Sequence, residues 1–541
     1  MRLPTMTSYD AAYDAFRWDV PARFNFGRDV VDARAARQPD HPALIWCDAA
    51  GAEQCFSYGD MARLTDRCAH ALAARGVAKG DRVIVMLPRL PQWQIALVGC
   101  LKLGAVPIPC IDMLTARDVA YRATHAGAKA VVTTASNTAK FAAIDAPLVV
   151  RLAVGGVALP PGWQDFDAAL AAADERFEAA DMAAEEPAIL YYTSGSTGHP
   201  KGVAHAARAL FAWRVSAVYW LDLAERDVMW CTADTGWSKA GTSILFGPWS
   251  RGAAVVFYDG PFDPARRLAL MARHRVTVFC ASATELRRLL EEDLARYDLS
   301  ALRLTVSAGE TVNPDIVERW QARLGVPLLD GYGQTETLMT VVNYRTMAVK
   351  PGSMGKPLPG LEVAVVDPAL RRVAPGTAGQ LAIRLPNPQM MLGYWNEPER
   401  MAAATAEIDG ARYFLTGDVV RADADGYLFY DGRTDDLINS AGYRIGPLEV
   451  ENAILEHEAV QECAVVGSPD PERGEIVTAF IVLRAGVAPS PALVQDIQDH
   501  VKRITAPYKY PRRIEFLDEL PKTATGKVLR RALRERERRG G

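Results

Sequence analysis

Strand and helix signals alternate along the first part of the chain, and this alternation constrains the fold more than any other feature. Residues 81–88 (DRVIVMLP) and 129–134 (KAVVTT) are apolar enough to read as buried strands, and residues 105–110 (AVPIPC) predict a strand between them. Residues 91–105 and 116–128, which separate these segments, predict helices. Because strands separated by helices are typical of a parallel sheet covered by helices, we predict an α/β fold.

The same alternation returns in the middle of the chain. Residues 253–258 and 302–309 read as strands, and residues 326–333 (VPLLDGYG) read as a strand followed by a loop. Asn313 and Pro314 predict a helix start, since Asn is a favoured N-cap and Pro fits the first turn. We therefore expect two similar α/β halves within one large domain.

A chain of 541 residues is too long for a single core, so we expect more than one structural unit. From about residue 355 to 434, short alternating strands and turns predict a β-rich subdomain. Residues 435–541 predict a small α+β domain that follows a large domain over residues 1–434. The arginine-rich C-terminal segment predicts a solvated helix and a frayed end rather than a nucleic-acid-binding arm.

Composition excludes several other classes of protein. The net charge of -4 gives no support for nucleic-acid binding, and the eight cysteines form no CxxC pair, which argues against structural zinc. The N-terminus lacks the apolar core of a signal peptide, and no apolar run approaches the length of a membrane span. We expect a soluble cytoplasmic protein whose cysteines are mostly reduced core thiols.

Residues 191–202 (YYTSGSTGHPKG) are rich in glycine and hydroxyl residues and contain one lysine, Lys201, next to the end, which predicts a loop. The spacing differs from the phosphate loop of P-loop enzymes, which needs GxxxxGK followed by Ser or Thr. The chemistry is shared, because glycines let backbone N–H groups approach phosphate oxygens while hydroxyls and lysine add donors and charge. The alternative is a flexible surface linker, but the apolar segment before the loop argues against it.

At this loop the chain resembles the adenylate-forming superfamily, which contains acyl-CoA synthetases, adenylation domains and luciferases. The motifs that carry the resemblance follow one another in order over nearly the whole chain, at residues 193–202, 232–237, 330–337, 416–418, 432–451 and 521–527. Residues 439–457 and 505–516 look like the medium-chain acyl-CoA synthetase branch. The resemblance implies a small C-terminal domain that moves, with a hinge at Asp435. It also implies a carboxylic acid that attacks ATP to give acyl-AMP and pyrophosphate, and a CoA thiol that then displaces AMP.

The resemblance implies a role for each motif. Thr335, Glu336 and Lys527 are expected to be catalytic: Thr335 contacts the α-phosphate and the acid, Glu336 helps hold Mg²⁺, and Lys527 contacts the attacking carboxylate. Tyr332 stacks on adenine, and Asp418 accepts hydrogen bonds from the ribose. The full set of expected ATP-binding residues is Thr193, Ser194, Gly195, Ser196, Thr197, Gly198, His199, Pro200, Lys201, Asp330, Gly331, Tyr332, Gly333, Gln334, Thr335, Asp418, Arg433, Arg444 and Lys527.

CoA and the acyl group have weaker signatures. The expected CoA-binding residues are Ala441, Gly442, Tyr443, Arg473 and Arg503. Trp237 and Gly333 are expected to line the acyl pocket, and the glycine disfavours acetate because acetate-specific relatives carry a tryptophan there. Medium-chain, branched and aromatic acids stay open, as do an aryl-CoA ligase, an adenylation enzyme that loads a carrier protein, and a non-catalytic binding protein on the same scaffold.

Overall fold

The computed structural model describes residues 3–142, 144, 148–156, 158–193, 200–310, 312–434, 436–440, 443–470, 473–505, 509–522 and 528–540. The chain divides into two compact units: Met1–Glu362 with Arg384–Ala406, and Val363–Ile383 with Glu407–Gly541. Residues 407–434 thus group with the C-terminal residues. The predicted hinge, Asp435, lies outside the described residues, and the division of domains at 434/435 stays a prediction.

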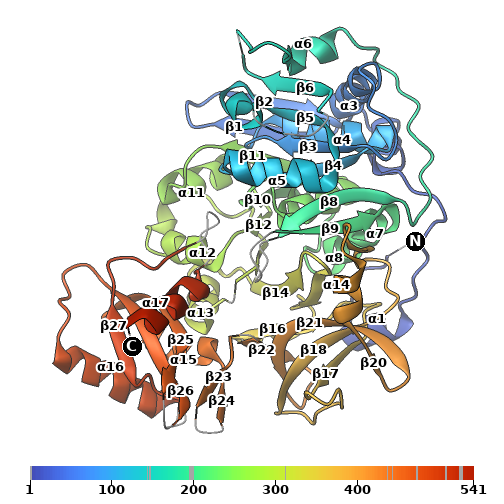
Figure 1. Ribbon diagram of the computed structural model, residues 1–541. Helices are drawn as coiled ribbons and strands as arrows, with labels where there is room; N and C mark the ends of the chain where they lie inside the picture. The colour runs from blue at the N-terminus through green and yellow to red at the C-terminus, as the bar shows by residue number, and fades with distance from the viewer. Residues whose placement is uncertain are drawn as a thin grey trace. The chain divides into compact units, whose positions relative to one another are not determined.

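The first unit contains a large sheet with a parallel centre (Figure 1). Its strands are arranged in the order β16-β15-β14-β13-β12-β10-β11-β1-β2. Neighbours from β14 to β1 are parallel, while β15, β16 and β2 are antiparallel additions at the two ends. The strand bounds are β1 Pro42–Asp48, β2 Glu53–Ser57, β10 Val228–Cys231, β11 Ala254–Asp259, β12 Val278–Cys280, β13 Leu304–Ala308, β14 Leu328–Gln334, β15 Leu338–Val342 and β16 Ser353–Pro357.

A second sheet of the first unit is parallel throughout and confirms the predicted βαβ rhythm. Its order is β4-β3-β5-β6-β7. The bounds are β3 Arg82–Met86, β4 Val106–Pro109, β5 Ala128–Thr134, β6 Val150–Val154 and β7 Gln164–Asp165. Helices α4 (Pro91–Leu103) and α5 (Ala116–Ala126) connect its strands where the sequence predicts them. Thr115 caps α5 through a reciprocal capping box with Asp118, which fixes where that helix begins.

Short and interrupted helices complete the first unit. Asn313 caps α13 by accepting a hydrogen bond from the Asp315 N–H at 2.9 Å, as predicted. The remaining helices are α1 Tyr9–Ala15, α2 Ala33–Ala35, α3 Tyr58–Ala73, α6 Phe166–Ala171, α7 Ala207–Ala212, α8 Arg214–Tyr219, α9 Ser238–Ala240, α10 Gly247–Arg251, α11 Pro264–Arg273, α12 Ala283–Leu289, α13 Pro314–Leu324 and α14 Pro398–Ala403. Two π-helical turns, η1 Gly27–Asp32 and η3 Gly241–Phe246, and two 3₁₀ turns, η2 Ala135–Phe141 and η4 Leu294–Arg296, interrupt them.

The second unit contains two sheets. One has the order β17-β18-β21-β22, with β20 paired to β21, and corresponds to the predicted β-rich part. The other has the order β24-β23-β26-β25, with β27 paired to β26. Helices α15, α16 and α17 alternate with its strands along the sequence. The bounds are β17 Val363–Val366, β18 Ala378–Arg384, β20 Thr405–Ile408, β21 Ala411–Ala422, β22 Leu428–Arg433, β23 Ile438–Ser440, β24 Tyr443–Ile445, α15 Pro447–Leu455, β25 Val460–Asp470, β26 Gly474–Leu483, α16 Pro491–Ile504, β27 Arg513–Phe516 and α17 Arg530–Gly540.

Two predictions of local structure were wrong in part. Strand β14 continues through Gln334 instead of ending in a loop, because residues 331–334 pair with β15. Helix α17 forms as predicted but is not merely solvated: Leu533 and Glu537 are buried, and Glu537 accepts hydrogen bonds from Ser468 and Arg513.

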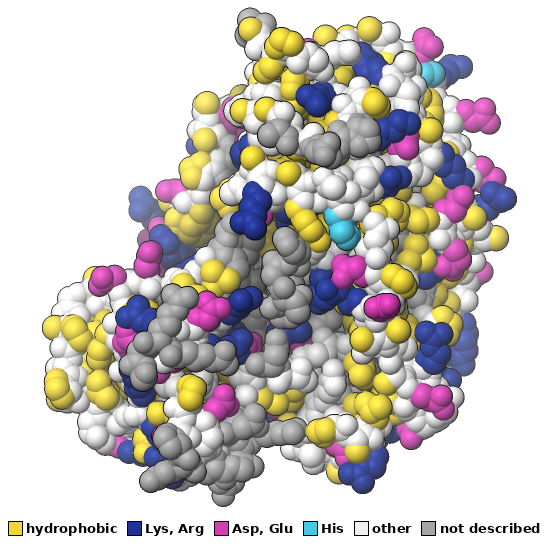
Figure 2. Space-filling model, viewed as in Figure 1, with side chains coloured by type: hydrophobic (Ala, Val, Ile, Leu, Met, Phe, Trp, Pro, Cys, Tyr) yellow, Lys and Arg dark blue, Asp and Glu magenta, His cyan; other side chains and the backbone are white. Residues whose placement is uncertain are grey.

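The helices, the surface charge and the cysteines can be compared with the expectations from composition. None of the helices in the described ranges combines the length and the apolar character that crossing a bilayer requires. The face in Figure 2 carries acidic and basic side chains interspersed, with no broad field of one sign. All eight cysteines are free, and six of them are buried; Cys55 is exposed and Cys463 half-buried.

Candidate active site

The glycine- and hydroxyl-rich loop joins two strands of a small antiparallel sheet. Strand β8 (Pro187–Thr193) enters it and β9 (Lys201–Ala206) leaves it, and Thr193 pairs with Lys201 across the base. The Tyr121 hydroxyl donates to the Pro200 carbonyl at 3.1 Å. The rest of the predicted loop residues, Ser194, Gly195, Ser196, Thr197, Gly198 and His199, lie outside the described residues.

Lys201 is linked to Glu336 through an aromatic residue that sequence reasoning missed. Strand β9 also pairs with β19 (Gly393–Tyr394), which brings Tyr394 beside it. The Lys201 ammonium lies 5.4 Å from the centre of the Tyr394 ring, a cation–π distance, and the Tyr394 hydroxyl donates to Glu336 Oε1 at 2.9 Å. A strand of two residues has no periodicity, so the sequence offered no signal for Tyr394.

The acidic motif of residues 330–337 lies on β14 and the hairpin turn that follows it. Asp330, Gly331, Tyr332, Gly333 and Gln334 are strand residues, and Thr335 and Glu336 lie in the turn. The turn is closed by the Thr337 hydroxyl, which accepts a hydrogen bond from the Gln334 N–H at 3.0 Å.

His205, a second residue that sequence reasoning missed, joins β9 to this turn. Its Nε2 lies 2.8 Å from the Thr335 carbonyl oxygen, so Nε2 carries the proton and donates. The ring is fully buried, and burial lowers the pKa of His205 to about 3. A neutral imidazole therefore fixes the backbone of a predicted catalytic residue relative to the strand that begins at Lys201.

Asp330 is a buried acid. Burial raises its pKa to about 8, against the lowering effect of hydrogen bonds from the backbone of Gly331 and Val312. A carboxyl group with this pKa is mostly protonated at neutral pH and adds little negative charge to the site.

The two residues predicted to line the acyl pocket lie in different surroundings. A Cβ atom at Gly333 would come within 2.0 Å of the Leu338 carbonyl oxygen, so close approach of β15 requires glycine there whatever the acyl group is. Acyl space at this position stays a prediction. Trp237 is half-buried at the start of α9, and the next residue, Ser238, has its hydroxyl 3.4 Å from the Thr335 hydroxyl.

The predicted ribose-binding residues meet within the second unit. Asp418 on β21 is paired in register with Arg433 on β22, and their side chains lie 3.3 Å apart. Asp418 is 3% exposed, and the Tyr430 hydroxyl lies 3.4 Å from the same carboxylate oxygen. Gly417 has φ of +73°, a left-handed conformation that favours glycine just before this aspartate.

Lys527 lies outside the described residues, but both ends of its segment are tied down. Lys522 and Val528 form an antiparallel bridge. One guanidinium nitrogen of Arg530, Nη2, donates hydrogen bonds of 2.7 Å to both oxygens of Glu451, a charge-assisted pair in which Glu451 is 5% exposed.

The predicted CoA residues are described only in part. Ala441 and Gly442 lie outside the described residues, and Tyr443 and Arg444 are described only as backbone of β24. Arg473 is half-buried beside Asp470, and Arg503 is exposed on α16. Their roles stay predictions.

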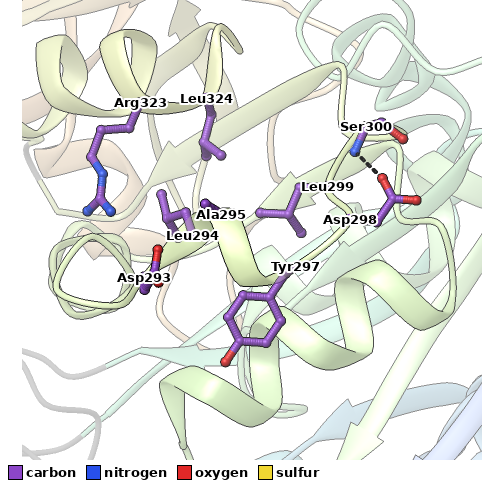
Figure 3. Close-up of a pocket in the computed structure, with 9 residues that line it drawn as sticks. All are labelled: Asp293, Leu294, Ala295, Tyr297, Asp298, Leu299, Ser300, Arg323 and Leu324. Carbon is purple, nitrogen blue, oxygen red and sulfur yellow. Dashed lines mark hydrogen bonds between the residues drawn. The ribbon is translucent and has the colours of Figure 1, made fainter.

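A separate pocket of about 450 Å³ opens in the first unit (Figure 3). It is lined by Asp293, Leu294, Ala295, Tyr297, Asp298, Leu299, Ser300, Arg323 and Leu324. None of the residues predicted from the sequence is among them, so this pocket is distinct from the site described above.

Comparisons with known proteins agree with the resemblance. A family model described as AMP-binding enzyme matches residues 31–395, and one described as AMP-binding enzyme C-terminal domain matches residues 449–527. The acyl-coenzyme A synthetase ACSM3 of Mus musculus is 38% identical over 544 residues, covering 98% of this chain and 93% of that protein. The uncharacterized acyl-CoA ligase YtcI of Bacillus subtilis (strain 168) is 41% identical over 520 residues, covering 96% of this chain and 97% of that protein.

Solved structures share the fold. The anthranilate CoA ligase AuaEII in complex with anthranoyl-AMP has a TM-score of 0.87 at 29% identity, covering 96% of this chain and 98% of its own. A benzoate CoA ligase from Burkholderia xenovorans LB400 has a TM-score of 0.82 at 30% identity, covering 94% and 100%. This chain therefore belongs to the AMP-binding enzyme family and is an AMP-forming acyl-CoA ligase that uses ATP, CoA and a carboxylic acid.

Proposed function

We propose that this ligase acts on a medium-chain or branched carboxylic acid, which it converts first to acyl-AMP and then to acyl-CoA. The observation that carries the site assignment is the contact of Tyr394 with both Lys201 and Glu336. This contact joins the end of the glycine- and hydroxyl-rich loop to the acidic motif of residues 330–337. The resemblance of residues 439–457 and 505–516 to the medium-chain acyl-CoA synthetase branch supports the choice of acid.

Adenylation joins two anions, so the site must neutralise charge and align the reactants. In our proposal Lys201 and the loop hold the β- and γ-phosphates, and Tyr332 stacks on adenine. His205 fixes the backbone of Thr335, and the Thr335 hydroxyl orients the α-phosphate and the attacking carboxylate.

Glu336 fits a site for Mg²⁺. Glu336 is 8% exposed and its carboxylate is oriented by the Tyr394 hydroxyl, and a hard oxygen ligand beside substrate phosphates is what this ion prefers. Within the described ranges no three His, Cys, Asp or Glu side chains cluster as a metal cage. When bound, Mg²⁺ supplies neutralisation of phosphate charge.

The second unit is proposed to contribute the remaining groups. Asp418 accepts hydrogen bonds from the ribose hydroxyls, with Arg433 beside it, and Lys527 contacts the attacking carboxylate during adenylation. Rotation at Asp435 then replaces Lys527 with the face that holds Gly442 and Tyr443, along which the CoA arm enters.

Pyrophosphate release with hexanoate, octanoate, isobutyrate and benzoate, each with and without CoA, tests the proposal. We expect hexanoate or octanoate to give the highest kcat/KM and mass spectrometry to detect the matching acyl-CoA. Fastest turnover of benzoate would instead support an aryl-CoA ligase, which the fold similarity to the benzoate and anthranilate ligases favours as second candidate. Acyl-AMP that reacts with a carrier protein but not with CoA would contradict both. Cytoplasmic location stays a prediction that cell fractionation can check.

A further inference from the structure

Lys239 is a cation next to the proposed reaction centre that none of the assigned roles uses. It is the middle residue of α9, one position after Ser238, whose hydroxyl contacts that of Thr335. Its ammonium group donates to the carbonyl of Ala308, the last residue of β13, at 2.9 Å. It therefore lies at the carboxyl ends of the parallel strands, where α/β sheets bind their ligands.

Within the described part of the chain, no carboxylate lies at ion-pair distance from this ammonium group. An ammonium group offers three donors, and the bond to Ala308 is the single hydrogen bond that Lys239 Nζ makes there. The carboxylates that face it are committed elsewhere. Glu310 accepts from the Thr284 N–H at 2.9 Å, and Glu285 accepts from the Thr232 hydroxyl at 2.6 Å.

Lys239 is nevertheless charged. Burial disfavours the ammonium form, but the neighbouring groups Cys280, Cys231, Glu310 and Glu285 outweigh burial and raise its pKa. Asp330 also faces Lys239, but its own raised pKa keeps it mostly neutral at neutral pH.

Lys102 is a structural lysine with which Lys239 can be compared. It is fully buried, and its ammonium donates to Asp32 at 2.6 Å, to Asp66 at 2.5 Å and to the Ala62 carbonyl at 3.1 Å. All three donors are used inside the protein. Lys239 is half-buried, with two donors left over beside the proposed acid site.

The backbone that presents Lys239 is held firmly. The Thr242 hydroxyl donates to the Lys239 carbonyl at 3.2 Å. The next turns of this helical run form η3, a π-helix of the kind often found at functional sites. Gly241, which opens η3, approaches the Tyr191 hydroxyl so closely that a Cβ would lie 2.1 Å from it.

We propose that Lys239 selects the acid: its free donors bind an oxygen acceptor carried on the acyl part, for which a second carboxylate is the best match. The inference rests on the proposed function, because Thr335 must receive the reacting carboxylate for the acyl part to extend toward Lys239. Ser238, whose hydroxyl contacts that of Thr335, and Lys239 are neighbouring residues of α9, and side chains of neighbouring helix residues point about 100° apart. One end of the acid therefore meets Thr335 and the other end meets Lys239.

Matched pairs of acids test this selection. Hexanoate is compared with adipate and octanoate with suberate, in wild type, Lys239→Met, Lys239→Gln and Lys239→Arg, by pyrophosphate release and acyl-CoA formation. We expect wild type to favour the dicarboxylate of each pair at least tenfold in kcat/KM. Lys239→Met and Lys239→Gln are expected to lower kcat/KM for dicarboxylates at least tenfold more than for plain acids, through KM for the acid, while Lys239→Arg retains part of the preference.

A stability comparison separates this role from a structural one. Lys239→Met takes no partner from any described carboxylate, so its Tm should stay within a few degrees of wild type. Lys102→Met leaves Asp32 and Asp66 without their cation and should lower Tm clearly.

Several results would overturn the inference. One is a wild-type preference for the plain acid at both chain lengths. Another is a ratio of kcat/KM for dicarboxylate over plain acid that is unchanged in both Lys239→Met and Lys239→Gln. A third is a rise in KM for ATP alone. The last would assign Lys239 to the nucleotide. Loss of the preference together with a fall in Tm as large as that of Lys102→Met would make Lys239 structural. Absence of pyrophosphate release with every acid would refute the proposed function itself, and the inference with it.

Discussion

At the scale of single residues, His205 combines a positioning role with an unusual charge state. It is buried with its Nε2 bonded to the Thr335 carbonyl, and its pKa of about 3 lies well below the value near 6.5 of an unfolded histidine. Below pH 6.5 the unfolded chain therefore binds a proton that the folded protein does not take up until the pH nears 3. The free energy of unfolding should fall as the pH is lowered through this window.

His205→Ala should lower stability and slow adenylation, because the Thr335 carbonyl loses its donor. An unpaired buried group costs about 1–3 kcal/mol. Urea unfolding at neutral pH and the rate of pyrophosphate release measure the two effects. His205→Gln is the control: it keeps an amide N–H near the position of Nε2 but does not titrate. It should retain most of the rate and lose part of the acid sensitivity between pH 6.5 and 4, and an equal loss of rate in both variants would contradict the positioning role.

Two lysines should differ in which half-reaction they affect. Lys527→Ala is expected to abolish adenylation but leave thioester formation from supplied acyl-AMP largely intact, since in our proposal Lys527 contacts the attacking carboxylate only in the first step. Lys201→Ala should weaken ATP use less severely, because its proposed role is to position the phosphates. Single-turnover assays of each half-reaction make the comparison, and equal loss of both halves in Lys527→Ala would refute its role.

At the scale of elements, helix α17 anchors the segment that carries Lys527. Arg530 in its first turn donates to both oxygens of Glu451 through one nitrogen, and Glu451 also accepts a hydrogen bond from the Val465 N–H at 2.8 Å. The pair thus joins α17 to α15 and β25.

Arg530→Met should destabilise the second unit, because it leaves Glu451 buried without its cation. Breaking a buried pair costs roughly 3–5 kcal/mol, and the lower end is expected because the Arg530 side chain keeps 29% of its exposure. Arg531→Met, which breaks the exposed pair with Glu535, is the matched control and should cost about 0–1 kcal/mol. Thermal unfolding measures both, and similar costs would show that α17 needs no such anchor.

Elements were predicted well from the sequence wherever their causes are local. The cap at Asn313 and the helices after β3 and β4 depend on residues within a few positions, and they formed as expected. The end of β14 did not, because its pairing with β15 overrides the turn tendency of its glycines. The same limit explains the site: the motifs identified Lys201 and Glu336, whereas Tyr394 joins them only through the pairing of β19 with β9, nearly two hundred residues along the chain.

At the scale of the whole molecule, the proposed cycle requires the small domain to change position between half-reactions. Proline fixes φ near −65°, so Asp435→Pro should slow this change and lower steady-state turnover more than the rate of adenylation alone. Asp435→Ala, which leaves φ free to rotate, is the control and should turn over close to wild type. Unchanged turnover in the proline variant would mean that rotation occurs elsewhere.

The pairing of Thr193 with Lys201 has a consequence for how nucleotide affinity responds to loop length. Formation of the sheet already brings the two ends of the loop together, so the entropy of closing it is lost in folding and not when ATP binds. Doubling the length of a flexible loop adds only about 0.6 kcal/mol to that closure cost. Residues inserted between Thr193 and Pro200 should therefore change ATP affinity when they change which hydrogen-bond donors face the phosphates of the proposed site. The added length by itself should hardly change the affinity.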